Sequence, residues 1–171
     1  MRKLLIIALG AALGLAPLAG CDAAEGPAAA AADPAKNLVD AKAWLAKNAK
    51  APGVVTLPSG VQYKIVKTGP VTGPHPRPQD WVKIHYEGKL TNGEVFDSSY
   101  ERGVPTSFVL GNLIPAWIEG LQRMRPGDEW ILYVPPEQGY GEEGAGDKIP
   151  PNSALVFRIE LFDILPGFAV D

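Results

Sequence analysis

The sequence of 171 residues predicts an α+β domain in which one helix covers an antiparallel sheet. Two observations carry this prediction. Between residues 62 and 161, short segments of alternating apolar residues are separated by turn residues, which is typical of antiparallel strands. One segment, residues 114–124, instead carries apolar residues at helical spacing. Because the apolar face of such a sheet needs a cover, we expect the helix to lie across it.

The first 20 residues are typical of an export signal rather than of the folded domain. Two basic residues precede an apolar run at positions 4–15, which is too short to span a membrane comfortably. The segment ends in Leu18-Ala19-Gly20-Cys21, which resembles the lipobox of bacterial lipoproteins and implies that Cys21 becomes a lipid-modified first residue. Cys21 is the only cysteine and therefore cannot form an intramolecular disulfide. The alternative is an ordinary secretory signal in which this cysteine is incidental.

The segment after the signal is predicted to be a tether followed by a short helix. Residues 21–36 are rich in alanine, proline and glycine, lack a repeating apolar face, and are therefore expected to be flexible. Pro27 and Pro34 argue against a continuous helix in this stretch. Residues 37–50 carry an imperfect apolar stripe around Trp44, which predicts a short helix that a following Pro-Gly pair ends.

The expected domain spans residues 54–166, and its elements carry recognisable boundary signals. A strand with alternating apolar residues ends at Tyr86, and Asn92-Gly93 then predicts a hairpin. The helix that follows has Pro115 in its first turn, where a missing N–H has no consequence. Arg125-Pro126-Gly127 ends this helix. Two further strands are predicted, at residues 130–134 and 155–161.

Composition and residue types argue against the commoner chemistries. The net charge of −3 does not favour nucleic acid as a partner. The chain has two histidines and no Cys/His set with metal-ligand spacing, so we predict neither a metal nor another cofactor. The glycine-rich residues 139–146 lack the Lys-Ser/Thr ending of a phosphate loop, and Glu142-Glu143 is better read as a solvated loop than as an acid/base pair. Hydrolase, kinase and metalloenzyme functions are therefore disfavoured.

A set of aromatic residues beside turns and loops points instead to an apolar binding site. For any single member, filling the core is the better interpretation. The local settings of the whole set, however, favour a binding role. Tyr140 lies in a glycine-flanked loop, which is a poor place for a core residue, and Phe96 directly precedes Asp97. The set comprises Tyr86, Phe96, Phe108, Trp117, Tyr140 and Phe157.

The same settings belong to six motifs that occur in the order found in one protein family. The motifs are Ile84-His85-Tyr86-Glu87-Gly88, Gly93-Glu94-Val95-Phe96-Asp97-Ser98-Ser99, Phe108-Val109-Leu110-Gly111, Leu113-Ile114-Pro115-Ala116-Trp117-Ile118-Glu119-Gly120-Leu121, Pro135-Pro136-Glu137-Gln138-Gly139-Tyr140-Gly141 and Ile149-Pro150-Pro151-Asn152-Ser153-Ala154-Leu155-Val156-Phe157. With them the sequence resembles the FKBP-type peptidyl-prolyl cis-trans isomerases. Residues 59–63 are similar to the opening strand of the bacterial Mip-like branch, whose members often carry a helical N-terminal extension.

The resemblance implies a bent antiparallel sheet wrapped around the helix at 114–124, with an apolar pocket for a proline ring between them. Trp117 would form the pocket floor, while the Ile114 N–H and the Tyr140 hydroxyl would hydrogen-bond the substrate backbone. Asp97 would lie at the pocket edge, close to Arg102. The walls would be formed by Tyr86, Phe96, Phe108, Leu113, Ile114, Ile149 and Phe157.

Three features depart from the family pattern. Thr106 occupies a wall position that usually carries an aromatic residue, and Lys148 occupies a loop position that is often apolar. The stretch between Gly111 and Trp117 is shorter than in small cytosolic members, although similar to bacterial ones. These departures leave substrate preference and affinity for macrolide inhibitors open.

The resemblance implies a prolyl isomerase that needs no cofactor, acts on proline-containing polypeptides and assists the folding of exported proteins. The alternative is a chaperone or scaffold that binds proline-containing segments with little turnover. We expect the protein in the cell envelope, facing the periplasm and anchored through Cys21. Asp22 leaves the choice between inner and outer membrane open. We expect a monomer, with dimerisation through the helix at 37–50 as the alternative.

Overall fold

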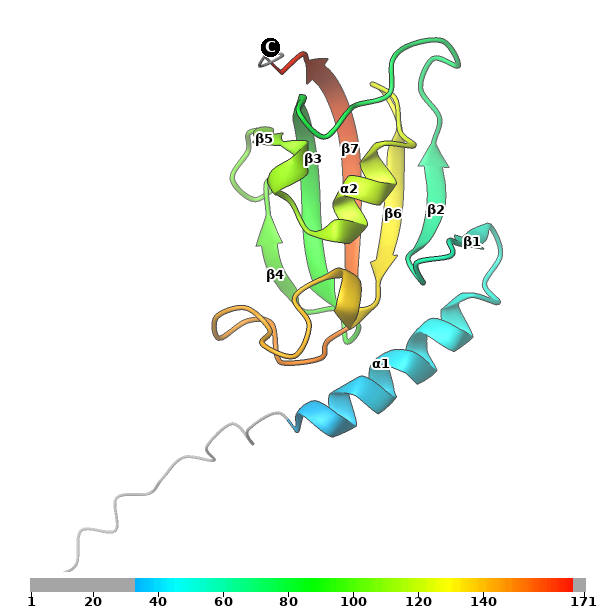
Figure 1. Ribbon diagram of the computed structural model, residues 1–171, viewed down its shortest axis with the longest axis vertical. Coiled ribbons are helices and arrows are strands. Elements are labelled where there is room, and N and C mark those ends of the chain that lie inside the picture. Colours follow the sequence, from blue (N-terminus) through cyan, green and yellow to red (C-terminus); the bar gives the residue numbers. More distant parts are fainter. Residues whose placement is uncertain (1–32, 168–171) are drawn as a thin grey trace, which may run out of the picture. The chain divides into compact units, whose positions relative to one another are not determined.

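The computed structural model describes residues 33–167. The expected signal segment at 1–20 and Cys21 lie outside this range, as does most of the expected tether at 21–36. None of the helices within residues 33–167 is long and apolar enough to span a membrane. In chain order the elements are α1 (Pro34–Asn48), β1 (Val54–Thr56), β2 (Gln62–Lys67), β3 (Trp81–Leu90), β4 (Val95–Ser98), β5 (Thr106–Val109), the 3₁₀ turn η1 (Leu110–Asn112), α2 (Pro115–Leu121), β6 (Glu129–Val134), the 3₁₀ turn η2 (Pro136–Gln138) and β7 (Leu155–Leu165), as shown in Figure 1.

The seven strands form one antiparallel sheet with the order β1-β2-β6-β7-β3-β4, and β5 also pairs with β3. The long strand β3 pairs with β7 on one side and with β5 and then β4 on the other. Its register shifts at Lys83/Ile84 against β7 and at Gly88/Lys89 against β4. Such bulges bend a strand and increase its twist. The predicted fold, a bent antiparallel sheet with one covering helix, is confirmed.

Neither β1 nor β5 is predicted by the sequence pattern. β1 has three residues and β5 has four, which is too short for alternation to stand out from chance. Both form because neighbouring strands already present unpaired backbone groups to them. The pairing is therefore a property of the assembled sheet rather than of the short segments.

The helix α2 lies against the sheet and closes the main core (Figure 1). Trp117 and Leu121 are buried among strand residues that include Leu132 of β6. Gly120 makes the close approach possible, because a Cβ at this position would lie 2.7 Å from a methyl carbon of Leu132. The predicted helical spacing extends to Met124, which is fully buried, but α2 ends at Leu121. The Met124 N–H bonds the Leu121 carbonyl three residues earlier, so the last turn is tightened beyond α-helical geometry.

The helix α1 begins at Pro34, three residues before the predicted start at 37, and ends at Asn48 rather than at 50. The Asp33 carboxylate accepts hydrogen bonds from the Ala35 and Lys36 backbone N–H groups and so caps the helix. Pro34 then occupies the first helical position, where no intrahelical donor is needed. The proline that argues against a helix from composition is thus part of its start.

Candidate active site

A cavity of about 190 Å³ lies between α2 and the concave side of the sheet, and we call it the aromatic pocket. It is lined by Tyr86, Phe96, Asp97, Phe108, Leu113, Ile114, Trp117, Tyr140 and Phe157. The structure thus brings nine of the ten residues of the expected site together around one cavity. The tenth, Ile149, lines an adjoining cavity of about 500 Å³ that shares Phe96, Asp97 and Tyr140 with the first.

The aromatic rings of the pocket pack edge to face around the α2 indole. Tyr86 of β3 and Phe157 of β7 lie with ring centres 5.2 and 5.1 Å from that of Trp117, at interplanar angles of 75° and 89°. Phe108 of β5 lies 6.3 Å from Trp117 in the same kind of contact. This arrangement is favoured by the charge distribution of aromatic rings. Trp117 is only 5% exposed, so the other rings pack around a buried indole.

Gly88 has a role in the pocket that the sequence pattern does not reveal. A Cβ at this position of β3 would lie 2.5 Å from a ring carbon of Phe96 and 2.8 Å from one of Phe157. Both wall rings therefore rest directly on the β3 backbone, and any side chain would displace them. The only signal in the sequence is a glycine within an otherwise alternating strand, which can mark a place where another group packs closely against the strand backbone.

The edge of the pocket carries a closed set of three polar side chains. Asp97 of β4 accepts hydrogen bonds from the Tyr86 hydroxyl and from the Arg102 guanidinium. Arg102 also donates to the Tyr86 hydroxyl oxygen over 2.8 Å, and its guanidinium carbon lies 5.4 Å from the centre of the Tyr86 ring. Each member thus restrains the other two, and the carboxylate is held in a defined orientation.

The pKa values in this group follow from burial and from the hydrogen bonds. Burial raises the pKa of Asp97, but hydrogen bonds from Tyr86 and Arg102 outweigh it and leave this pKa below its ordinary value. Burial raises the pKa of Tyr86, and its hydrogen bond to Asp97 adds to the rise. Burial, followed by the nearby Asp97 charge, also raises the pKa of Tyr140. At neutral pH the pocket therefore presents a carboxylate and two protonated phenols.

Two donors at the pocket remain available to a ligand. The Ile114 N–H, directly before α2, makes no hydrogen bond within residues 33–167. The Tyr140 hydroxyl likewise has no partner in this part of the chain, and Tyr140 is 39% exposed. Both residues line the aromatic pocket. An extended backbone that enters the pocket could therefore be held by two hydrogen bonds.

The two residues that depart from the family pattern, Thr106 and Lys148, lie in different places. Thr106 shares a face of β5 with Phe108, but its shorter side chain is not among those that line the aromatic pocket. Lys148 lines the adjoining cavity, and its ammonium group donates to the Phe96 carbonyl over 3.3 Å. The charge at 148 therefore stands beside the pocket rather than within it.

The residues present favour an uncharged, apolar ligand group. The aromatic pocket has one ionised side chain, Asp97, and otherwise offers rings and aliphatic groups. In the described range of 33–167, no three His, Cys, Asp or Glu side chains gather where they could hold a metal ion. The arrangement can bind a ring, orient the adjoining backbone and exclude water.

Comparison with known proteins identifies relatives over most of this range. The family model described as FKBP-type peptidyl-prolyl cis-trans isomerase matches residues 73–162. A second model, for the domain amino-terminal to these isomerases, matches residues 22–65. A solved peptidyl-prolyl cis-trans isomerase from Pseudomonas syringae is similar with a TM-score of 0.72 and 36% identity, over 79% of this chain and 98% of that one.

Two curated relatives come from other bacteria. The peptidyl-prolyl cis-trans isomerase Mip of Coxiella burnetii is 47% identical over 128 residues, which are 75% of this chain and 55% of that protein. The outer membrane protein MIP of Legionella longbeachae is 41% identical over 129 residues, which are 75% of this chain and 54% of that protein. The chain thus spans about half the length of these relatives.

Proposed function

The chain belongs to the family of FKBP-type peptidyl-prolyl cis-trans isomerases, and on this basis we propose that its aromatic pocket binds a prolyl ring and accelerates rotation about the X–Pro bond. The observation that carries the proposal is the pocket itself, in which aromatic rings, a buried indole and two donors without a partner among residues 33–167 meet around one cavity. We assign binding of the ring to Trp117 and the surrounding walls. We assign orientation of the substrate backbone to the Ile114 N–H and the Tyr140 hydroxyl.

Prolyl rotation breaks no σ-bond, so the pocket needs neither a nucleophile nor a general acid. The barrier of roughly 18–20 kcal/mol comes from amide resonance, which places negative charge on the carbonyl oxygen. A water-excluding aromatic pocket disfavours this polar, planar amide relative to the twisted one. The fixed Asp97 carboxylate acts in the same direction, because it repels negative charge on an oxygen nearby and does so less once the amide twists. Lowering the barrier by ~5 kcal/mol would accelerate rotation a few thousandfold.

A refolding assay tests the proposed activity. We expect the full chain, in excess over an unfolded protein whose refolding is limited by a trans-to-cis prolyl step, to shorten that slow phase, because uncatalysed exchange takes tens to hundreds of seconds. The control is the double variant Trp117→Ala, Tyr140→Phe, which we expect to leave the slow phase unchanged. An unaltered slow phase with the wild-type chain would contradict the proposal, as would full activity of the double variant.

A binding module with little turnover is the second candidate. It is favoured by the adjoining cavity, where Lys148 adds a positive charge beside the pocket. That charge could strengthen the binding of an acidic segment without contributing to rotation. Exchange spectroscopy by NMR on a proline-containing peptide separates the two candidates. A binding module would shift the peptide resonances but leave the cis-trans exchange rate unchanged.

We further propose that the protein is anchored in the cell envelope through Cys21 and faces the periplasm, where it would assist the folding of exported proteins. The lipobox-like residues 18–21 and the name of the Legionella relative, an outer membrane protein, support this proposal. We expect Cys21→Ala to move the protein from the membrane fraction to the soluble fraction, because a triacylated anchor holds firmly and its removal leaves only weak interactions.

Fractionation of cells that express the wild-type chain or Cys21→Ala, followed by immunoblotting, measures how the protein divides between the membrane and soluble fractions. Asp22→Ser serves as the matched variant, since it should keep the protein in the membrane fraction and report on the choice between inner and outer membrane. Retention of Cys21→Ala in the membrane fraction would contradict lipid anchoring.

A monomer is supported by the way α1 uses its apolar side. Ala41 and Leu45 are buried against Ala154, and the Trp44 ring lies 5.9 Å from that of Tyr133. This stripe therefore contacts the chain's own domain and is not free for a second copy. We propose that the chain does not dimerise through α1.

A further inference from the structure

The loop between η2 and β7 carries two residues of the site, Tyr140 and Ile149, and we call residues 139–152 the site loop. Four of its backbone hydrogen bonds are internal, and the Gly139 and Gly141 N–H groups donate to the Pro136 carbonyl of η2. Ala145 and Ile149 exchange backbone hydrogen bonds of 2.9 and 3.1 Å, and the Gly144 N–H donates to the Tyr140 carbonyl. On the sheet side, Ile149 is buried in the main core and Lys148 donates to the Phe96 carbonyl of β4. The remaining attachment of the loop is at its far end.

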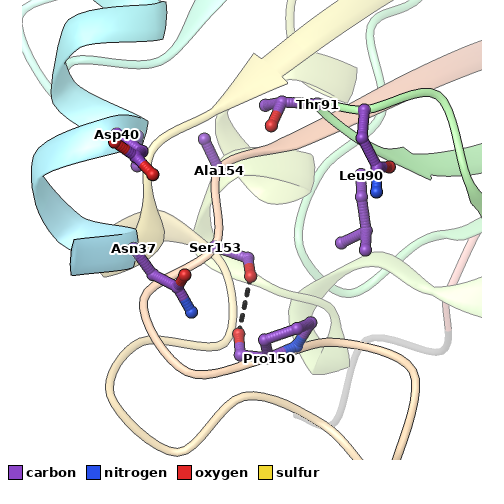
Figure 2. A pocket seen from close by; sticks show the side chains of 9 residues that line it. Asn37, Asp40, Leu90, Thr91, Pro150, Ser153 and Ala154 are labelled. Atoms are coloured by element: carbon purple, nitrogen blue, oxygen red, sulfur yellow. Dashed lines mark hydrogen bonds between the residues drawn. The ribbon is translucent and has the colours of Figure 1, made fainter. Parts of the chain in front are cut away.

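The far end of the loop is joined to α1 by a reciprocal pair of amide side chains. The Asn37 side-chain amide donates to the Pro151 carbonyl over 2.8 Å, and the Asn152 amide donates to the Pro34 carbonyl over 3.0 Å. Figure 2 shows Asn37 projecting from α1 toward the segment that carries Pro150 and Ser153. We call this pair the amide clamp.

Asn152 links the clamp to the backbone beside Tyr140. Its own N–H donates to the Gly141 carbonyl over 2.8 Å. With a φ of 56°, it is also the only non-glycine residue in the left-handed region among residues 33–167, a conformation that asparagine tolerates better than most residues. This conformation lets its side chain reach α1 while its backbone holds Gly141. One residue thus connects the helix to the neighbour of Tyr140.

The helix is itself firmly attached to the sheet, so it can act as a support. At its other end, the Gln62 amide of β2 donates to the Leu45 carbonyl over 2.9 Å. The Asn48 amide donates to the Gln62 side-chain oxygen over the same distance. Between the two ends, the apolar contacts of Ala41 and Leu45 with Ala154 secure the middle of the helix.

We propose that α1, through the amide clamp of Asn37 and Asn152, is a positioning element that holds the site loop and with it Tyr140 at the aromatic pocket. The catalytic consequence rests on the isomerase function proposed above, whereas the mechanical role does not. A donor that is displaced by even a fraction of an ångström orients a substrate less well. The clamp should therefore affect the rate although neither asparagine lines the aromatic pocket.

Variants of the full chain test the proposal. We expect Asn37→Ala, and separately Asn152→Gly, to lower kcat/KM for a proline-containing peptide by about three- to tenfold, as the loss of an ordinary hydrogen bond would. Glycine at 152 keeps the left-handed backbone and the bond to Gly141, so it removes only the side-chain link. The matched control is Asn48→Ala, which removes one amide hydrogen bond at the other end of α1 but leaves the helix attached through the bond from Gln62 to Leu45 and the contacts with Ala154. It should change kcat/KM by less than about twofold.

A double-mutant cycle distinguishes positioning from general destabilisation. If the clamp acts through the Tyr140 hydroxyl, Asn37→Ala should have little further effect on kcat/KM in the Tyr140→Phe background. An equal loss in both backgrounds would overturn this assignment, as would a loss in Asn48→Ala that matches the loss in Asn37→Ala.

Amide hydrogen exchange keeps the test independent of catalysis. We expect faster exchange at Gly144, Ala145 and Ile149 in both clamp variants than in Asn48→Ala, because the loop opens more often without its support. Should the wild-type chain prove inactive while these amides exchange faster, the proposed isomerase function fails and the clamp stands. Unchanged exchange in both clamp variants overturns the clamp, whatever the activity.

Discussion

Replacing Trp117 with alanine is expected to lower the free energy of unfolding by about 3–5 kcal/mol and to abolish isomerase activity. The indole is 5% exposed and touches rings from β3, β5 and β7. Its removal leaves a cavity that the bent sheet cannot close and takes away the floor on which the proline ring would rest. Urea unfolding monitored by circular dichroism measures the first effect, and peptide isomerisation below the unfolding transition measures the second.

Trp117→Phe is the control that separates the floor from the indole N–H. The Trp117 Nε1 atom is buried and has no hydrogen-bond partner within the described residues, so phenylalanine removes no stabilising hydrogen bond while it keeps an aromatic surface. We expect this variant to retain a measurable part of the activity and to unfold at a higher urea concentration than the alanine variant. Equal loss of activity in both variants would contradict the assignment of Trp117 as an apolar floor.

Replacing Asp97 with asparagine is expected to lower kcat/KM by about ten- to a hundredfold, which is the range of a hydrogen bond to a charged group. The substitution removes the negative charge from the pocket edge and weakens the hydrogen bonds from Tyr86 and Arg102. Glu101→Gln is the matched control, because it removes a negative charge from the neighbouring turn without altering a residue of the pocket. Isomerisation rates of a proline-containing peptide at neutral pH measure both variants.

The pH dependence gives a second readout of Asp97. Because its folded pKa lies below the ordinary value of about 3.9, its contribution to stability is present above that value and is lost as the pH falls through the folded pKa. The wild-type chain should therefore lose activity and stability on acidification below about pH 4, and protonation of Asp97 should contribute to this loss. In Asp97→Asn the contribution of Asp97 to the acid loss should be absent. An identical acid limb in both proteins would show that Asp97 does not contribute to it.

The local patterns predicted the parts of the fold that repeat along the chain. Alternation up to Tyr86, the Asn92-Gly93 turn and Pro115 at a helix start each depend on near neighbours, so the strands, the hairpin and the covering helix follow from the sequence. Elements that depend on distant partners could not be predicted from these patterns. β5 exists because β3 offers it an edge. Pro34 begins α1 because Asp33 caps it, whereas composition alone indicated an interruption.

The candidate site divides in the same way. The ordered motifs named Tyr86, Phe96, Trp117 and their companions, and the family they indicated is confirmed, although the roles of these residues stay predictions. The sequence did not reveal the polar set as a closed group of three, because Arg102 reaches Tyr86 and Asp97 from a separate turn. It also did not reveal why position 88 must be glycine, since the rings that rest on it come from two other strands.

By itself, the sequence determined the antiparallel α+β domain and named the aromatic residues that are proposed as its site. Periodicity and residue type suffice for this because they act over a few neighbouring residues. Only the tertiary structure decided which groups meet, from the orientation of Asp97 to the amide clamp between Asn37 and Asn152. The two clamp bonds join residues more than 100 positions apart. The bonds to Asp97 span fewer positions, but they too depend on how strands and turns pack in space.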